Sequence, residues 1–251
     1  MADNYIKDTL KDVIKHTHSL GIFEMVKITG TLTETSVETV DADKTVIFKG
    51  RTVKPVPDFV DNTVGLSRMS VLDGYLKFPG FDDAEATVKV VSQERNGATV
   101  PTEVGFVAAD GTDATYRFML ADVVNAQLKN IAFKGAEWDI DIVPTQKNLK
   151  DLAYFNSVLG QFESTFSPRT EGGKLYFHIG DGGGDRTKIL VNEAPGGEIV
   201  HEFRWPLDIV LKILRLSESS NVVMSINAKG LLQIVVHSGV GEYTYLLPAK
   251  G

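Results

Sequence analysis

The organisation of this chain first becomes visible in KNLKDLAYFNSVLGQF, residues 147–162, where apolar side chains recur three and four positions apart. This period predicts an amphipathic helix. Short runs with the alternation typical of β-strands follow, the last of them EIVHEFRW (198–205), and then a second helical pattern, LDIVLKILRLS (207–217). More β-like runs complete the chain. Residue 147 therefore begins a block in the order helix, strands, helix, strands.

The same order occurs once before residue 147. YIKDTLKDVIKHTHSL (5–20) and LSRMSVLDGYLKFP (66–79) have the helical period, and each precedes short β-like runs separated by Gly or Asp turns. An order of elements that repeats at about 120 residues predicts two similar domains. We expect an α+β fold with an N-terminal domain at 1–122, a connector at 123–146 and a C-terminal domain at 147–251. A single long β domain is the alternative.

A glycine-rich loop, GDGGGDR (180–186), separates two β-like runs, KLYFHI (174–179) and TKILVNE (187–193). A phosphate-binding glycine loop would instead lead into a helix, whose N-terminal N–H groups bind the anion. Asp181 and Asp185 are too few oxygen ligands for an EF-type calcium loop. The loop therefore predicts the turn of a β-hairpin.

The composition excludes several kinds of site. The chain has 251 residues, a formal net charge of −7 and no cysteine, so disulfides, zinc–thiolate centres and thiol nucleophiles are excluded. No apolar run reaches membrane-spanning length, and the N-terminal residues lack the pattern of a signal peptide. We expect a cytoplasmic location, in the host cell if the protein is viral.

No enzyme signature stands out in the sequence. His16 and His18 lie two positions apart on a helical pattern, so they do not share a face and make a poor metal pair. His201-Glu202 is not followed by the second histidine of a zinc-protease helix. We therefore expect no catalytic residues, no metal and no cofactor, although a catalytic carboxylate pair cannot be recognised from sequence alone.

Two segments resemble a known family. NAKGLLQIVVHSGVGEYTYLLPAKG (227–251) is similar to the closing strands of proliferating cell nuclear antigen, and KFPGFDDAEATVKVV (77–91) is similar to a stretch of the clamps of T4-type bacteriophages. Together with the order of elements, they make the chain resemble the DNA polymerase sliding clamps, the processivity factors of DNA replication. The resemblance implies two clamp-type domains, each with two helices packed on antiparallel sheets, and a ring of three identical subunits whose helices line the hole. The shorter strands and the glycine-rich hairpin depart from the eukaryotic clamp.

Basic residues recur on all four helical patterns of this acidic chain. On the first, lysines follow an arc beside the apolar stripe, while acidic residues concentrate in turns and at strand ends elsewhere. Flexible lysines suit weak phosphate contacts that carry no sequence information. The alternative is a set of solvated helices with local Lys–Asp pairs. The residues expected to face double-stranded DNA are Lys7, Lys11, Lys15, His18, Arg68, Lys77, Lys147, Lys150, Lys212 and Arg215.

Ring closure requires two edge strands. By position in the repeat, the candidates are ATYRFML (114–120) of one subunit and TKILVNE (187–193) of the next, and the alternative is that both are interior strands. The sequence thus predicts head-to-tail pairing between copies of the chain.

The resemblance also implies an apolar groove that binds short peptide tails of the DNA polymerase and the clamp loader. The residues expected there are Tyr245, Leu247 and Pro248 near the chain end and Ile131 and Phe133 in the connector. The alternative function is a β-rich structural or virion-type assembly protein that does not encircle DNA.

Overall fold

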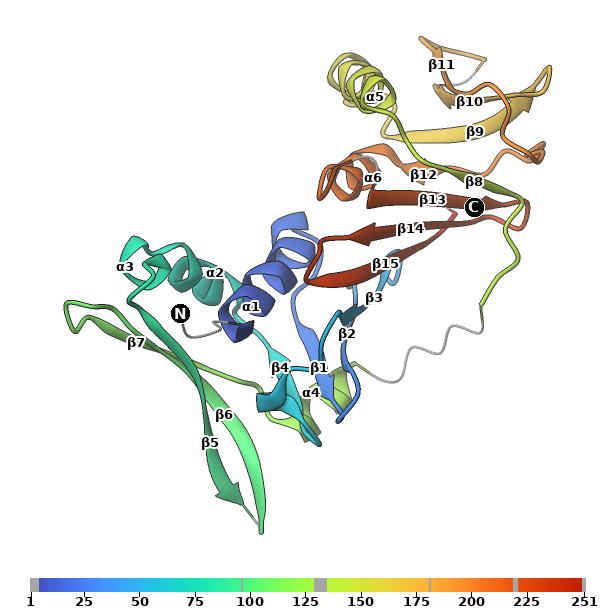
Figure 1. The fold of residues 1–251 in the computed structure, drawn as a ribbon. Helices are drawn as coiled ribbons and strands as arrows, with labels where there is room; N and C mark the ends of the chain where they lie inside the picture. The colour runs from blue at the N-terminus through green and yellow to red at the C-terminus, as the bar shows by residue number, and fades with distance from the viewer. Residues whose placement is uncertain (1–4, 96, 129–134, 181, 219–220, 250–251) are drawn as a thin grey trace. The chain divides into compact units, whose positions relative to one another are not determined.

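The computed structural model describes residues 5–95, 97–128, 135–180, 182–218 and 221–249. The chain forms two compact units, here called unit 1 (Met1–Ala132 with Gly239–Tyr243) and unit 2 (Phe133–Ser238 with Thr244–Gly251). Both combine helices with antiparallel sheets, which confirms the α+β fold class (Figure 1). Gly239–Tyr243 belongs to unit 1, whereas the sequence predicts this segment in the C-terminal domain at 147–251.

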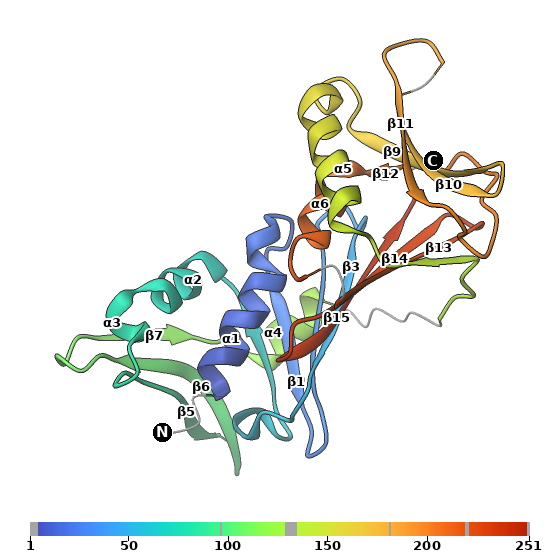
Figure 2. The same ribbon diagram turned by 45° about the horizontal axis from the view of Figure 1, so that its top comes forward.

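The two longer helices of unit 1 are α1 (Tyr5–His16) and α2 (Met69–Lys77), which lie side by side (Figure 2). Leu10 and Val13 of α1 are fully buried, as the apolar period predicts. A 3₁₀ turn at His18–Leu20 follows α1 and ends at Gly21, whose φ of 73° favours glycine. The helix expected over 5–20 is therefore shorter. Two short helices complete the unit: α3 (Pro79–Asp82) and α4 (Ala121–Gln127).

Unit 1 contains two antiparallel arrangements of strands. The first has the order β4 (Thr63–Leu66), β1 (Val26–Gly30), β2 (Thr35–Val40), β3 (Ile47–Thr52). The second has the order β5 (Thr87–Arg95), β6 (Ala98–Val107), β7 (Asp113–Arg117). Figure 1 shows β5 and β6 as a long hairpin.

An aromatic cluster holds the core of unit 1 beside β3. Tyr243 stacks on Phe48 with ring centroids 5.6 Å apart and on His16 at 4.1 Å, and its hydroxyl donates to Asp12 Oδ2 at 2.6 Å. A Cβ at Gly50 would lie 2.4 Å from the Tyr243 ring, so this strand position requires glycine. Burial lowers the pKa of His16 to about 3, which keeps the stacked imidazole neutral at physiological pH.

The helices of unit 2 are α5 (Gln146–Leu159) and α6 (Leu207–Leu214), which also lie side by side. A capping box begins α5: Thr145 Oγ1 accepts from the Asn148 N–H at 3.1 Å, and Asn148 Oδ1 accepts from the Thr145 N–H at 2.8 Å. In α6 the apolar period buries Leu207, Val210 and Leu211.

Unit 2 also has two antiparallel arrangements of strands. One runs β15 (Gly241–Pro248, whose residues from Thr244 belong to this unit), β14 (Leu231–His237), β13 (Val222–Asn227), β8 (Ile140–Ile142). The other runs β11 (Thr187–Asn192), β10 (Lys174–Ile179), β9 (Thr165–Glu171), β12 (Trp205–Pro206). The antiparallel pairing of β10 with β11 confirms the predicted glycine-rich hairpin. Asp181, one of the two acids considered for a metal, lies outside the described residues.

One local prediction was wrong, and two elements were missed. The strand expected over 198–205 is reduced to β12, because the chain there turns tightly, with the Phe203 N–H donating to His201 O at 3.1 Å. Strand β4 and helix α4 were not expected at all. Both are short, and their apolar residues Val64, Leu66 and Val124 are buried by contacts distant in sequence.

Candidate nucleic-acid interface and subunit edges

Two of the expected DNA-facing lysines on α1 are held by α3. Lys7 is only 6% exposed, and its Nζ donates to the Asp82 backbone oxygen at 3.0 Å and lies 3.4 Å from Asp82 Oδ1. Lys11 pairs with the same carboxylate, and the Lys11 hydrogen bond is the main cause that holds the pKa of Asp82 below its ordinary value. The expectation that Lys7 faces DNA is corrected on this ground, because a buried ammonium group engaged at Asp82 cannot reach a phosphate.

Three further cations form pairs along their own helices. Each bonds to an aspartate one turn earlier or later, as in the alternative considered from the sequence, and such exposed pairs contribute at most about 0.5 kcal/mol each. The pairs are Lys77–Asp73 at 2.6 Å, Lys212–Asp208 at 2.9 Å, and Lys147–Asp151. These lysines remain exposed, so the pairs can open in favour of a phosphate.

Four of the cations expected to face DNA are exposed and have no ion-pair partner among the described residues: Lys15, Arg68, Lys150 and Arg215. One lies on α1, one at the start of α2, one on α5 and one at the end of α6. His18 is half-buried in the 3₁₀ turn after α1. Each unit therefore contributes two of the expected DNA-facing cations that can contact an anion without breaking an ion pair.

Both strands expected at the subunit contact lie at the edges of their arrangements. β7 is the last strand after β5 and β6, and β11 is the first strand before β10. On β11, the Leu190 carbonyl oxygen already accepts a hydrogen bond from Asn148 Nδ2 of α5, at 3.2 Å. Helix α5 therefore lies directly beside the β11 edge.

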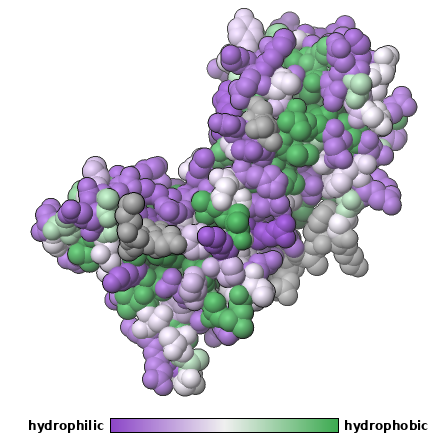
Figure 3. All heavy atoms as spheres, viewed as in Figure 1, coloured by the Kyte–Doolittle hydropathy of each residue, from purple (hydrophilic) through white to green (hydrophobic). Residues whose placement is uncertain are grey.

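The exposed face of α5 is apolar at its C-terminal end, a feature not anticipated from the sequence. Tyr154 is 64% exposed, Val158 is 50% exposed, and Phe162, just beyond the helix, is 82% exposed. Hydrophobic side chains also reach the surface of unit 2 in Figure 3. We call Tyr154, Val158 and Phe162 the α5 apolar stripe. Their spacing of four residues could have revealed this stripe in the sequence, but the apolar residues of this helical pattern were all assigned to the core.

The expected peptide groove is not formed by the side chains proposed for it. Tyr245 and Leu247 are both 0% exposed, and Leu247 O accepts from the buried Trp205 Nε1 at 2.7 Å. These two placements are therefore corrected: alternation along β15 directs both side chains into the core of unit 2. Pro248 is exposed. Ile131 and Phe133 lie outside the described residues.

Replacing Leu247 by Ala is expected to lower the free energy of unfolding by about 2–5 kcal/mol, because it leaves a cavity in a closely packed core. Pro248→Ala should change it by about 0.5 kcal/mol or less. Urea denaturation followed by tryptophan fluorescence measures both, since Trp205 contacts the Leu247 backbone. A destabilisation as small for Leu247→Ala as for Pro248→Ala would contradict the core placement.

No described helix is long and apolar enough to cross a membrane. Among the same residues, no group of three or more histidine, aspartate or glutamate side chains is arranged to hold a metal ion.

Solved structures share this fold over nearly the whole chain. A. fulgidus PCNA, in a structure with the C-terminal region of FEN-1 bound, matches with a TM-score of 0.71 at 12% identity, over 98% of this chain and 96% of that chain. PCNA from Thermococcus kodakaraensis matches with a TM-score of 0.69 at 13% identity, over 97% of each chain. The PCNA2–PCNA3 complex from Sulfolobus tokodaii gives 0.65 at 12% identity, over 98% of this chain and 96% of that chain.

No family model and no curated protein matches the sequence. At 12–13% identity the structural likeness shows the fold alone, and the chain has the fold of the PCNA clamps.

Proposed function

We propose that this protein is a DNA polymerase sliding clamp, which encircles duplex DNA and tethers the replicative polymerase for processive synthesis. The observation that carries the proposal is the correspondence with PCNA folds across 97–98% of the chain. Such a protein is a binding module and not an enzyme. Its direct test is retention on closed circular DNA, while the alternative assembly protein would show no dependence on DNA topology.

The proposed assembly is a ring of three copies, with β7 of one subunit beside β11 of the next. The edge positions of both strands support it, since unpaired main-chain N–H and C=O groups favour strand pairing. The α5 apolar stripe supports it too, because Tyr154 and Phe162 would lose unfavourable water contact against a neighbouring subunit. In this proposal the division at 1–122, 123–146 and 147–251 reflects the two repeated clamp domains.

The proposed DNA contacts are the exposed cations of the helices, with Lys15, Arg68, Lys150 and Arg215 foremost. Few, separated and solvated cations attract a duplex without fixing its register, so it can slide. Lys11, Lys77, Lys147 and Lys212 contribute less, because each already contacts a carboxylate.

Neutralising three of the free cations, in Lys15→Gln/Lys150→Gln/Arg215→Gln, is expected to slow loading onto circular DNA about tenfold, because steering by charge governs encounter. Dissociation from a closed circle should change by less than about twofold, since topology and not contact holds the DNA. Stopped-flow fluorescence on labelled circles measures both rates.

The matched control for the triple variant is Lys147→Gln, which removes an exposed lysine already paired with Asp151 and should slow loading only slightly. If the triple variant instead left circles many times faster, contacts rather than encirclement would hold the DNA.

The proposed partners are double-stranded DNA, the DNA polymerase, the clamp loader and two further copies of the chain. Peptide tails would bind near Pro248 and the connector. The FEN-1 segment bound to A. fulgidus PCNA supports tail binding by a protein of this fold. The likeness of residues 77–91 to T4-type phage clamps supports a bacteriophage origin, and with it a place in the cytoplasm of the host.

A further inference from the structure

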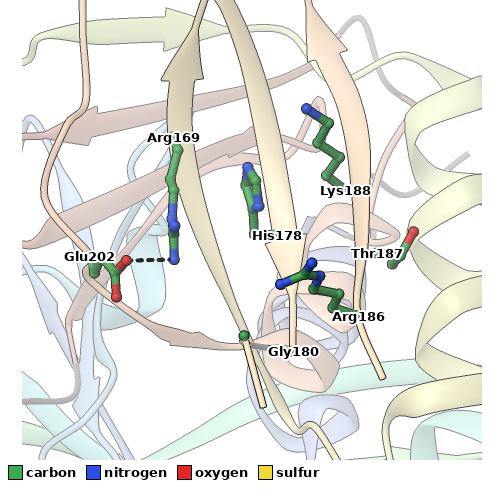
Figure 4. Close-up of a pocket in the computed structure, with 8 residues that line it drawn as sticks. Arg169, His178, Gly180, Arg186, Thr187, Lys188 and Glu202 are labelled. Carbon is green, nitrogen blue, oxygen red and sulfur yellow. Dashed lines mark ion pairs between the residues drawn. The ribbon is translucent and has the colours of Figure 1, made fainter. Parts of the chain in front are cut away.

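A hollow of about 640 Å³ lies on unit 2, beside the glycine-rich loop, and three of the described residues that line it are cationic. This volume is within the range of small-ligand sites, about 300–1,000 Å³. The lining includes Arg169 of β9, His178 of β10, Arg186 just before β11, and Lys188 of β11 (Figure 4). The sequence predicts that acidic residues concentrate outside the helices, and this hollow is an exception to that prediction.

The strand register explains why these side chains gather. His178 lies opposite Lys188, and Tyr176, two residues before His178, lies opposite Arg169. Side chains directly opposite each other share a face of the sheet, as do residues two apart on one strand. Arg169, His178, Arg186 and Lys188 therefore project from one face, although they lie up to 19 positions apart in sequence.

Two carboxylates hold part of this positive charge in place. Glu202 pairs with Arg169 Nη2 at 2.9 Å, and Glu171 pairs with Lys188 Nζ at 2.7 Å and lies 2.9 Å from His178 Nε2. Arg186 is exposed and has no ion-pair partner among the described residues. Burial lowers the pKa of His178, although Glu171 acts in the opposite direction, so the imidazole adds no charge at neutral pH. Of the described side chains that line the hollow, three are cationic and one, that of Glu202, is acidic.

One guanidinium donor in the hollow has no acceptor. Arg169 Nε is buried and makes no hydrogen bond within the described part of the chain. A buried N–H without an acceptor is rare, because its lost hydration is not replaced. Figure 4 shows the guanidinium groups of Arg169 and Arg186 approaching the end of β10 from its two sides.

Two described glycines of the loop, Gly180 and Gly182, line the hollow. Gly180 has a φ of 83°, and a Cβ there would lie 2.3 Å from the Asp185 backbone oxygen, so the turn requires glycine. Gly182 likewise carries no side chain toward Arg186. Gly180 and Gly182 therefore line the hollow without side chains, whereas its donors come from Arg169, Arg186 and Lys188.

We propose that this hollow binds a phosphate-type oxyanion between the guanidinium groups of Arg169 and Arg186. A tetrahedral anion offers enough oxygen atoms to engage donors on both β9 and β11, whereas one guanidinium fork satisfies a planar carboxylate. The site lies within unit 2 and does not depend on the proposed clamp function.

The test is isothermal titration of the full chain with inorganic phosphate at constant ionic strength. We expect one phosphate per chain, with binding weakened at least about tenfold by Arg186→Gln and partly kept by Arg186→Lys. The control Lys229→Gln, which removes an exposed lysine of the same unit that does not line the hollow, should change affinity by less than about twofold. Added phosphate should also shift the imidazole NMR signals of His178.

Two further ligands, adenosine monophosphate and acetate, distinguish which kind of anion the hollow binds. Adenosine monophosphate that displaces phosphate would identify a phosphate group carried by a larger molecule, and failure to displace it would identify the free ion. Acetate binding as tightly as phosphate, no phosphate binding at about 10 mM, or equal binding by Arg186→Gln would overturn the proposal. Phosphate binding by a monomeric variant that no longer holds circular DNA would separate this site from the clamp function.

Discussion

Protein assembled around closed circular DNA is expected to stay bound at about 1 M salt and to be lost once a nuclease cuts the circle. At this ionic strength the Debye length is about 3 Å, so attraction between the helix cations and phosphates is largely screened. A ring is still retained on a circle because it has no end to pass. On cut DNA the same ring slides off, and we expect at least about a tenfold loss of bound protein.

The measurement is gel filtration of labelled protein with nicked-circular plasmid, before and after cleavage by a single-site restriction enzyme. The matched control is the cut plasmid with a bulky protein bound at each end, on which retention should return. Equal retention on cut and uncut DNA would contradict encirclement and indicate a surface that binds DNA directly. Loss from both in high salt would indicate that no closed ring forms.

The double change Tyr154→Asp/Phe162→Asp is expected to convert the ring to monomers. Aromatic residues at the centre of an interface commonly contribute about 2 kcal/mol or more each, and each such loss weakens association about thirtyfold. Both side chains are largely exposed in the single chain, so their replacement should leave the fold intact. Native mass spectrometry at micromolar concentration should show trimers of the original chain and monomers of the variant.

The control for this double variant is Leu32→Asp, which places a charge at a residue 78% exposed in the turn between β1 and β2. It should remain trimeric, with far-ultraviolet circular dichroism unchanged in all three proteins. Intermolecular crosslinks should join β7 to β11 in the original chain and disappear in the double variant. A double variant that still assembles would remove the α5 apolar stripe from the proposed interface.

The spacing of apolar residues in the sequence predicted the helices and strands that bury one face in the core. The apolar residues of α1 and α6 are buried as their spacing predicts, and the alternating run before the glycines forms β10. The α+β class and the hairpin follow from such short-range patterns. Edge positions for β7 and β11 were also expected, from their places in the repeated order.

The sequence could not show which side chains are exposed and unpaired, because this depends on tertiary contacts. Lys7 is buried at Asp82, which is 75 positions away. Leu247, whose backbone oxygen accepts from Trp205, is also buried, although alternation alone does not say which face of β15 is the inner one. The cationic hollow likewise requires the register that brings Arg169, His178 and Arg186 together. Sequence patterns report which residues share a face of one element, whereas burial and charge pairing depend on what packs against that face. The sequence by itself therefore determined the elements and their order, and only the tertiary structure decided which cations, apolar side chains and hydrogen-bond donors remain available to a partner.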